Sequence, residues 1–419
     1  MASCLHSCTH PNARTSMIVL LLLSFAFIPG GVSFLHALQS ATPADRGPIF
    51  SRGQTYPTAG YISNSVAVGD FNGDGNLDIV VTNQCQDFSC SKDVQGTVTA
   101  RLGKGDGTFG GALISNAGNG APFSVAVGDF NRDGKPDLGL ASICNFDVFG
   151  FPFGEVHGLL GNGDGTFNNF YALGGGGPCP YAVAIGDFNL DGNLDMAVAL
   201  YCIDSFTCTD GFVGVYLGTG DGNFLDPVFY SYGGGHLQSI KVGDFNGDGK
   251  PDLAVGDGGP ETVTVLLGNG DGTFRIGAPF AFSINFVVGD FNGDDKSDLV
   301  GVSGNNLVLL LGNDDATFQP PITLNASPGV LAAADFNCDR KLDITVFNST
   351  GTTLLLGNGH GKFRTVHSSD LVGGVIAVGD FNNDGKPDLA ADDGSRVTVF
   401  LNVLHGSCHA ERNLALVLR

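Results

Sequence analysis

A nine-residue string rich in aspartate recurs seven times along the chain and constrains the possible folds more than any other feature. The copies are DFNGDGNLD from Asp70, DFNRDGKPD from Asp129, DFNLDGNLD from Asp187, DFNGDGKPD from Asp244, DFNGDDKSD from Asp290, DFNCDRKLD from Asp335 and DFNNDGKPD from Asp380. Successive copies begin 59, 58, 57, 46, 45 and 45 residues apart, a period typical of four-stranded propeller blades. The period therefore predicts an all-β fold, a seven-bladed β-propeller of four-stranded antiparallel blades.

The sequence around each string predicts four strands in each unit. A short apolar stretch precedes the string, as at residues 65–68 (SVAV), and another follows it, as at residues 79–82 (IVVT). A third apolar segment ends in a second motif, whose Gly-Asp-Gly is typical of a hairpin turn and is expected to bind nothing. Its copies are LGKGDGTF from Leu102, LGNGDGTF from Leu160, LGTGDGNF from Leu217, LGNGDGTF from Leu267, LGNDDATF from Leu311 and LGNGHGKF from Leu356.

The seventh unit lacks a fourth strand, and the N-terminal region can supply it. This unit ends at residues 397–402 (VTVFLN) without the second motif. Phe50 lies 20 residues before Asp70, the same separation as between the phenylalanines that close units one to three and the strings that follow them. The segment after Phe50 is therefore in phase to complete the last blade, which would close the ring and remove the open sheet edges.

The repeated string has the donor atoms of a calcium loop. In D-x-N-x-D-G-x-x-D, side-chain oxygens at positions 1, 3, 5 and 9 can converge, and position 7 can add its carbonyl. Oxygen donors at this density suit Ca²⁺, which takes about 6–8 oxygens, whereas softer metals prefer Cys or His. An EF-hand is excluded because it needs Glu at position 12 and flanking helices. Position 12 is Val81, Leu140, Val198, Val255, Gly301, Val346 or Ala391.

The predicted metal ligands are the four oxygen-bearing side chains of each string, so up to seven Ca²⁺ ions are expected. They are Asp70, Asn72, Asp74, Asp78, Asp129, Asn131, Asp133, Asp137, Asp187, Asn189, Asp191, Asp195, Asp244, Asn246, Asp248, Asp252, Asp290, Asn292, Asp294, Asp298, Asp335, Asn337, Asp339, Asp343, Asp380, Asn382, Asp384 and Asp388. The alternative is a set of Asp-Gly turns without metal. Asp295 and Arg340 replace Gly at position 6, which predicts strained turns and the two weakest sites. The Phe at position 2 is expected in the core.

These strings resemble the FG-GAP or VCBS-type repeats of integrin α-subunit propellers and many bacterial surface proteins. The resemblance covers about residues 48–403, and Gly at position 6 matches the family pattern in five units. It implies that positions 1, 3, 5 and 9 bind calcium on one face of a propeller, while ligand recognition often uses the opposite face. The resemblance implies a fold and a metal, but no particular ligand.

The N-terminus carries the pattern of a secretory signal. Arg14 precedes twelve apolar residues at 17–28 (MIVLLLLSFAFI), fewer than the about 20 residues of a membrane span. We therefore expect a signal peptide and short linker at 1–40, a propeller at 48–403 and a C-terminal tail at 404–419. This organisation predicts a secreted or cell-surface protein with no membrane span in the mature chain. The alternative is an uncleaved anchor.

Charge and cysteine content agree with an extracellular setting. The chain carries 20 Lys and Arg against 42 Asp and Glu, a formal charge of −22, which disfavours nucleic-acid binding. Eight cysteines follow the apolar run, an even number that suits an oxidising compartment. Zinc ligation is the alternative, but no nearby His completes a site. The spacing allows the pairs Cys85 with Cys90, Cys202 with Cys208, Cys144 with Cys179 and Cys338 with Cys408.

The first units are longer on the side away from the strings. From position 9 to the Leu of the second motif, or to Leu401, the separations are 24, 23, 22, 15, 13, 13 and 13 residues. From the closing Phe to the next string they are 20, 20, 20, 20, 16, 17 and 17. Aromatic residues in these connections predict a recognition surface, unless they pack under their own loops. They are Phe88, Phe146, Phe149, Phe151, Phe153, Tyr171, Tyr201, Phe206, Tyr230 and Tyr232.

The sequence favours binding over catalysis, although it leaves enzyme activity undecided. It contains no nucleophile elbow or zinc-protease helix, and a glycosidase pair of glutamates is improbable with only two glutamates in the propeller region. The histidines of that region, His157, His236, His360 and His367, are expected on the surface. We predict a monomeric extracellular recognition or adhesion module for a glycan or a protein. The alternatives are a calcium-dependent polysaccharide lyase or hydrolase, or a purely structural surface domain.

Overall fold

The computed structural model describes residues 49–85, 96–118, 120–146, 152–174, 179–201, 211–231, 235–348, 351–368 and 374–404. The chain divides into two compact units, Met1–Gly47 and Pro48–Arg419, and all described residues belong to the second. Their secondary structure is β-strand without α-helix, so this part of the chain contains no helix that could span a membrane. The apolar run at 17–28 lies outside the described residues.

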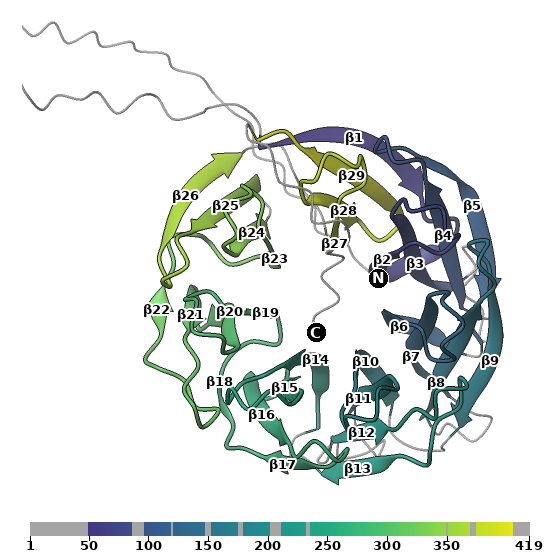
Figure 1. Ribbon diagram of the computed structural model, residues 1–419, viewed down its shortest axis with the longest axis horizontal. Helices are drawn as coiled ribbons and strands as arrows, with labels where there is room; N and C mark the ends of the chain where they lie inside the picture. The colour runs from purple at the N-terminus through teal and green to yellow at the C-terminus, as the bar shows by residue number, and fades with distance from the viewer. Residues whose placement is uncertain are drawn as a thin grey trace, which may run out of the picture. The chain divides into compact units, whose positions relative to one another are not determined.

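The strands form seven separate sheets arranged around a central axis (Figure 1). Each sheet is an antiparallel meander whose first strand lies nearest the axis and whose fourth lies at the outer rim. The sheets are the blades of a propeller, which confirms the predicted fold class. We number the blades 1 to 7 along the chain.

Blades 1 to 3 keep the order of their strands in the sequence. Their strands are β2 (Tyr61–Gly69), β3 (Asp78–Cys85), β4 (Thr97–Gly103) and β5 (Phe109–Asn116) in blade 1, β6 (Ala121–Gly128), β7 (Asp137–Phe146), β8 (Pro152–Gly161) and β9 (Phe167–Gly174) in blade 2, and β10 (Cys179–Gly186), β11 (Asp195–Tyr201), β12 (Phe212–Tyr216) and β13 (Val228–Ser231) in blade 3.

Blades 4 to 6 follow the same order, and β18 (Phe280–Ala281) also pairs with β16. Their strands are β14 (Leu237–Gly243), β15 (Asp252–Asp257), β16 (Thr262–Gly268) and β17 (Phe274–Ile276), then β19 (Phe286–Gly289), β20 (Asp298–Ser303), β21 (Asn306–Leu310) and β22 (Ile322–Thr323), then β23 (Val330–Ala334), β24 (Asp343–Asn348), β25 (Gly351–Gly357) and β26 (Phe363–Ser368). Blade 7 contains β27 (Val375–Gly379), β28 (Asp388–Asp392), β29 (Arg396–Asn402) and the N-terminal β1 (Phe50–Pro57).

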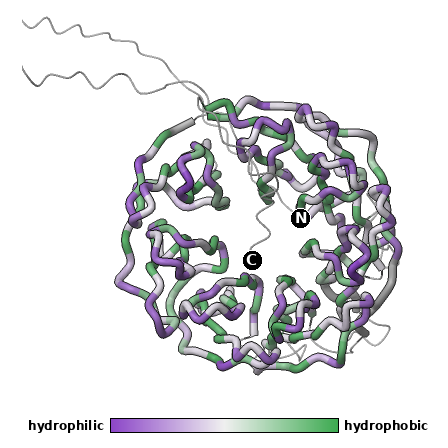
Figure 2. The backbone as a smooth tube through the Cα atoms, in the orientation of Figure 1, coloured by the Kyte–Doolittle hydropathy of each residue, from purple (hydrophilic) through white to green (hydrophobic). Residues whose placement is uncertain are grey.

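The core lies between blades rather than within any one sheet. Seven hydrophobic clusters are present among the described residues, and each combines side chains of two neighbouring blades. Both faces of a blade are therefore covered, so the second strands are buried along almost their whole length, as in β15. Figure 2 accordingly shows hydrophobic residues distributed through all blades around the ring.

The N-terminal strand closes the ring as predicted. β1 pairs with β29 in antiparallel register, with Phe50 opposite Asn402 and Tyr56 opposite Val397. Phe50 and Tyr56 are only 3% and 8% exposed, so this strand also contributes to the packing. The two ends of the propeller sequence thus share one sheet, and blade 7 has no unpaired outer edge on β29.

Deletion of β1 tests how much this closure contributes to stability. A chain that begins at Thr58 loses the burial of Phe50 and Tyr56, and a large apolar side chain contributes about 1.5–3 kcal/mol on burial. We expect a loss of at least about 3 kcal/mol in unfolding free energy, measured by denaturant unfolding. A chain that begins at Pro48 is the control and keeps full stability. Equal stability of the two chains would contradict the closure.

Candidate metal centres

Each Asp-rich loop joins the first strand of a blade to the second and curls around its own first carboxylate. In blade 1, Asp70 Oδ2 accepts a hydrogen bond from Gly75 N at 2.8 Å, and Asp70 Oδ1 accepts one from Asp74 N at 3.1 Å. Asn72 Oδ1 also accepts from Asp74 N at 3.1 Å, and Asp74 Oδ1 accepts from Asn76 N at 2.8 Å. The side chains at positions 1, 3 and 5 are therefore held together by the loop backbone.

The same hydrogen bonds recur in all seven loops. The amide at position 6 lies 2.6–2.9 Å from Oδ2 of position 1. The amide at position 7 lies 2.7–3.1 Å from Oδ1 of position 5. The predicted ligand positions thus have one geometry around the ring.

Two positions of each loop adopt positive φ, and the sequence indicated only one of them. Position 6 has φ between 64° and 85°, as its frequent Gly predicts. Position 4 also has φ between 57° and 80°, although it holds Arg132, Leu190, Cys338 or Asn383 in four loops. Asp295 and Arg340 adopt φ of 64° and 66° and keep the loop hydrogen bonds. The expected strain is therefore present in these two turns at position 6, while their weaker metal binding stays a prediction.

The aspartate at position 9 has a structural role that the sequence did not reveal. Asp78 is fully buried, and its Oδ2 accepts a hydrogen bond from Phe71 N at 2.8 Å. Its Oδ1 accepts one from Gly103 N at 2.7 Å, at the end of β4. Equivalent bonds occur in every blade at 2.7–3.0 Å to position 2 and 2.7–2.8 Å to the third strand. This carboxylate ties the loop to the third strand of its own blade.

Burial raises the pKa of every position-9 carboxyl group. The pKa rises to about 6 in blades 1 to 5 and to about 7 for Asp343 and Asp388. The main cause is desolvation, and the negative carboxylates at positions 1 and 5 raise it further, while backbone hydrogen bonds oppose the shift. The three carboxylates of one loop are thus close enough to repel one another.

The donor types of these loops fit a calcium ion. Three carboxylates and one amide oxygen are hard donors of the kind that Ca²⁺ prefers, and a divalent cation would neutralise carboxylates that otherwise repel. Among the residues that the structure describes, no group of three or more His, Cys, Asp and Glu side chains is already arranged to hold a metal ion. Many of the loop oxygens instead accept hydrogen bonds from backbone amides. Calcium binding therefore stays a prediction.

Lysine side chains partly balance the charge of four loops. The position-7 lysines Lys135, Lys250, Lys296 and Lys386 lie 3.4–3.8 Å from the position-5 carboxylates of their loops. Pairs of this kind near the surface contribute little to stability. They compensate only part of the negative charge of each loop.

The second-motif turns are stabilised by their own aspartates. In blade 1, Asp106 Oδ1 accepts hydrogen bonds from Thr108 N at 2.9 Å and from Thr108 Oγ1 at 2.5 Å. The turns at Asp164, Asp271 and Asp315 repeat this pair of bonds. These aspartates act in turn formation, as the hairpin prediction implied.

The second-motif turn also contacts the Asp-rich loop of the preceding blade. Gly165 N of blade 2 donates to Phe71 O of blade 1 at 3.1 Å, and the rings of Phe71 and Phe167 meet edge to face at 5.4 Å. Four other turns make the same backbone bond at 2.8–3.0 Å. The ring pair occurs at all seven blade junctions at 5.4–6.2 Å. Every position-2 Phe is at most 3% exposed, which confirms its place in the core.

Blade 7 has no second motif, and a side chain replaces the missing contact. Asn402 stands where the other third strands carry Gly, and its Nδ2 donates to Phe336 O of blade 6 at 2.8 Å. The same Nδ2 lies 3.2 Å from Pro387 O. The N-terminal strand supplies the ring, since Phe50 packs edge to face on Phe336 at 5.7 Å. The last junction therefore has the same kinds of contact as the five junctions with the backbone bond, made by different residues.

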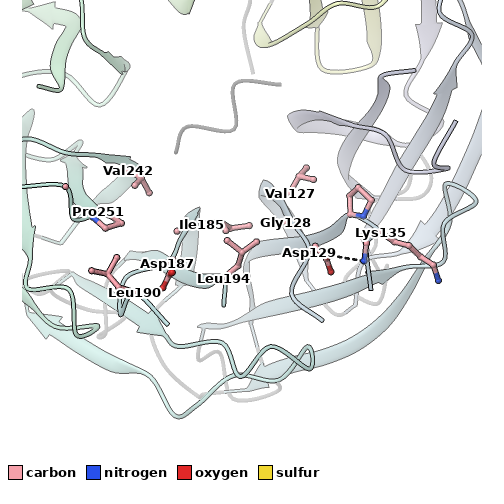
Figure 3. A pocket seen from close by; sticks show the side chains of 14 residues that line it. Val127, Gly128, Asp129, Lys135, Ile185, Asp187, Leu190, Leu194, Val242 and Pro251 are labelled. Atoms are coloured by element: carbon pink, nitrogen blue, oxygen red, sulfur yellow. Dashed lines mark hydrogen bonds between the residues drawn. The ribbon is translucent and has the colours of Figure 1, made fainter. Parts of the chain in front are cut away.

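A cavity of about 500 Å³ lies beside the loops of blades 2, 3 and 4 (Figure 3). Its wall is mostly apolar and includes Val127, Ile185, Val242 and Leu190. The loop carboxylates of Asp129 and Asp187 are at its edge. The sequence offered no signal for this cavity, because residues from three blades form it.

One of two predicted surface assignments is wrong. Tyr230, expected in a recognition surface, is partly exposed. Its hydroxyl accepts a hydrogen bond from Phe274 N at 3.1 Å, and its ring packs on Phe274 at 5.8 Å. His157 was expected on the surface but is 1% exposed, with Nε2 3.1 Å from Glu155 Oε2. The linear pattern could not reveal that His157 is buried, because burial depends on how the blades pack.

The other surface residues of the sequence prediction have mixed outcomes. Tyr201 and His236 are partly exposed and His360 is exposed, as predicted. The side chains of the remaining predicted aromatic residues and of His367 lie outside the described part of the chain. These are Phe88, Phe146, Phe149, Phe151, Phe153, Tyr171, Phe206, Tyr232 and His367.

Three of the eight cysteines that were expected to pair have side chains among the described residues. Cys85, Cys179 and Cys338 are disulfide-bonded. Their partner sulfur atoms lie outside the described residues, as do the side chains of Cys90, Cys144, Cys202, Cys208 and Cys408. The expected pairings therefore stay predictions.

Sequence comparison finds this chain similar to one repeat family. The profile of the FG-GAP-like repeat matches residues 86–140, 202–255, 244–296, 290–346 and 335–391. The profile of the FG-GAP repeat matches residues 63–99. Together the matched segments cover more than half of the chain and include the Asp-rich loops of all blades except blade 3. No curated protein matches the chain.

Solved structures share the fold at low sequence identity. A lectin of Agrocybe aegerita that recognises non-reducing terminal N-acetylglucosamine is 18% identical, with a TM-score of 0.53 over 82% of this chain and 86% of that one. BBS1N in complex with ARL6DN is 10% identical, with a TM-score of 0.57 over 86% and 99%. The WD40 domain of Toxoplasma gondii coronin is 12% identical, with a TM-score of 0.56 over 86% and 88%.

Substitution of Asn402 tests the contact that replaces the second motif in blade 7. Asn402→Asp places a carboxylate against Phe336 O and Pro387 O, and a buried polar group without its partner costs about 1–3 kcal/mol. We expect a loss of at least about 2 kcal/mol, measured by denaturant unfolding. Asn402→Gly, which removes the donor without adding charge, is expected to cost less.

Asn306→Asp is the control for charge in this experiment, because Asn306 is exposed where β21 begins. It adds the same negative charge to the protein and is expected to change stability by no more than about 0.5 kcal/mol. Equal effects of Asn402→Asp and Asn306→Asp would contradict the role of Asn402 at the last blade junction.

Proposed function

The chain belongs to the FG-GAP-like repeat family, and from this membership and the loop geometry we propose that it is an extracellular recognition module whose blades hold calcium. In this proposal the side chains at positions 1, 3, 5 and 9 of each Asp-rich loop bind one Ca²⁺, and the carbonyl at position 7 assists. The bound ion supplies positive charge that stabilises the three carboxylates. The protein is secreted or held at the cell surface, without a membrane span in the mature chain, and acts as a monomer.

The proposal that the loops bind calcium rests on one observation, the repulsion among carboxylates that recurs in all seven loops. Each loop brings three carboxylates together, and their mutual repulsion adds to the raised pKa at position 9. The position-7 lysines of four loops compensate this charge only in part. Seven divalent ions would bring the formal charge from −22 to −8. Calcium would also be available at high concentration outside the cell.

The recognition part rests on the fold and on the two different rims of the ring. The Asp-rich loops and second-motif turns repeat closely on one rim, whereas the connections on the other rim differ in length between blades. Variable connections on a rigid scaffold are typical of binding surfaces. The likeness to a lectin supports a binding role through the fold alone. The partner is proposed to be a glycan or a protein outside the cell.

The alternatives from the sequence find no specific support. A calcium-dependent polysaccharide lyase or hydrolase needs an accessible acid or base, and the close pair of Glu155 and His157 has its imidazole almost completely buried. A purely structural surface domain gives no reason for longer connections in the first blades. We therefore retain recognition as the proposal.

Metal removal tests the proposal directly. We expect the purified chain to contain up to seven Ca²⁺ ions and to lose thermal stability in EGTA, because a ligand at 100 times its Kd contributes about 2.7 kcal/mol. Added Ca²⁺ is expected to restore the melting temperature. Mg²⁺ is the control ion and is expected to restore less, because it demands a smaller octahedral site. The absence of bound calcium together with equal melting temperatures in EGTA and Ca²⁺ would refute the proposal.

A loop variant locates the ions. The double substitution Asp244→Asn and Asp248→Asn removes two carboxylates from the loop of blade 4 and is expected to lower the calcium content by one ion per chain. Asp271→Asn in the second-motif turn of the same blade is the matched control and is expected to keep the full content. Atomic absorption of the dialysed proteins measures the difference, and equal contents in the two variants would exclude this loop as a site.

A further inference from the structure

The first strands of blades 1 to 4 contain a β-bulge that those of blades 5 to 7 lack. The pairing with the second strand shifts by one residue at Asn64, Phe123, Tyr181 and Gln238. In the other three blades β19, β23 and β27 pair without a shift. The bulge explains part of the longer spacing before the first four strings. Such bulges re-aim a side chain and are frequent beside functional sites.

The four bulge residues lie at the rim opposite the Asp-rich loops. Each first strand runs toward its Asp-rich loop and ends there, so its beginning lies at the other rim. The four side chains are all partly exposed. Four consecutive blades therefore each have one extra, partly exposed residue at the equivalent position of the first strand.

Aromatic side chains connect three of these blades in a continuous row. Phe123 of blade 2 contacts Tyr181 of blade 3 with ring centroids 4.5 Å apart. Tyr181 stacks on Tyr201 at 6.2 Å and 28°, and Tyr201 meets His236 of blade 4 at 4.8 Å. The Tyr201 hydroxyl lies 3.5 Å from His236 Nδ1. We call Phe123, Tyr181, Tyr201 and His236 the aromatic row.

The aromatic row is not part of the core. None of its four residues belongs to the seven hydrophobic clusters between the blades. The core phenylalanines, such as Phe71 at 2% exposure, are buried, whereas all four rings of the row are partly exposed. Four rings that contact one another while staying partly open to water form a rigid apolar strip on the surface.

Amide groups flank the row at both ends. At the blade 1 end, Asn64 Nδ2 donates to Pro122 O at 3.2 Å, and Gln84 Nε2 donates to Asn64 Oδ1 at 3.3 Å. At the blade 4 end, Gln238 is the bulge residue of β14 and follows Leu237, the first residue of that strand to pair with β15. Amides offer both donors and acceptors. The site therefore combines flat apolar faces with neutral hydrogen-bonding groups.

We propose that the aromatic row with Asn64 and Gln238 binds the pyranose rings of a neutral glycan. A pyranose has an apolar C–H face, which fits the electron-rich face of an aromatic ring, and a rim of hydroxyl groups, which pair with amides. The row carries no Lys or Arg, and the chain has a formal charge of −22, so an anionic polysaccharide is disfavoured. This inference rests on the proposed recognition function and names its ligand class and surface.

Glycan binding by substituted chains tests the proposal. The calcium-loaded protein is screened on an array of neutral glycans, and chitotriose, cellotriose and maltotriose are then titrated by calorimetry. We expect binding by the unmodified chain and an affinity at least about tenfold lower for Phe123→Ala and for Tyr181→Ala, which corresponds to about 1.4 kcal/mol. Tyr181→Phe, which keeps the ring, is expected to bind within threefold of the unmodified chain.

The controls separate binding from folding. Phe229→Ala removes a 51% exposed aromatic ring from β13 at the outer edge of blade 3 and is expected to leave binding unchanged. Melting temperatures identify any variant that fails to fold, and Gln238→Ala then tests the polar end of the site with a smaller change. The chain has no Trp and eight Tyr, so tyrosine fluorescence can follow the titration. A saturable change that is smaller in Tyr181→Phe than in the unmodified chain is assigned to Tyr181.

The outcomes distinguish this inference from the proposed function. Undiminished glycan binding by Phe123→Ala and Tyr181→Ala would place the site elsewhere and overturn the inference. Absence of binding to every neutral glycan, with capture of an extracellular protein on a protein array, would also overturn it while the recognition function stands. Failure of the chain to bind calcium would refute the metal part of the proposed function without bearing on the row.

Discussion

The structure depends on three contacts made by one residue, the phenylalanine at position 2 of each Asp-rich loop. In blade 1 the Phe71 amide binds the buried Asp78 of its own blade, its carbonyl accepts from Gly165 of the next blade, and its ring packs on Phe167. The first contact shapes the loop and the other two join the blades. Repetition of these contacts converts seven sheets, each unable to bury both faces alone, into a closed ring.

This arrangement couples the charge of the loops to the stability of the ring. The position-9 aspartate is buried, accepts a hydrogen bond from the amide of the same phenylalanine, and experiences the negative charge of positions 1 and 5. Repulsion among the three carboxylates of a loop therefore acts at the junction between blades, rather than only in a surface turn. A cation in the proposed site would act on the blade junction through Asp78 and its equivalents, which gives a physical reason for calcium to stabilise the whole propeller.

The two rims of the ring have different degrees of regularity. At the rim of the Asp-rich loops, hydrogen bonds repeat to within a few tenths of an ångström in seven blades. At the other rim, four first strands carry bulges and three do not. The regular rim maintains the junctions, so the other rim can vary without loss of the ring, and this is the rim where we propose the recognition surface.

The sequence by itself determined the number of blades, their strand order, the closing role of the segment after Phe50, and the shared chemistry of the loops. These features follow from local signals, since a turn needs its Gly and Asp within a few residues and a period is visible in one dimension. Only the tertiary structure decided the roles of position 9 and of Asn402, the burial of His157, and the aromatic row. Asn402 and Phe336 are 66 residues apart, and Phe123 meets Tyr181 from another blade. Contacts of this kind depend on how blades face one another, and spacing along the chain carries no record of that orientation.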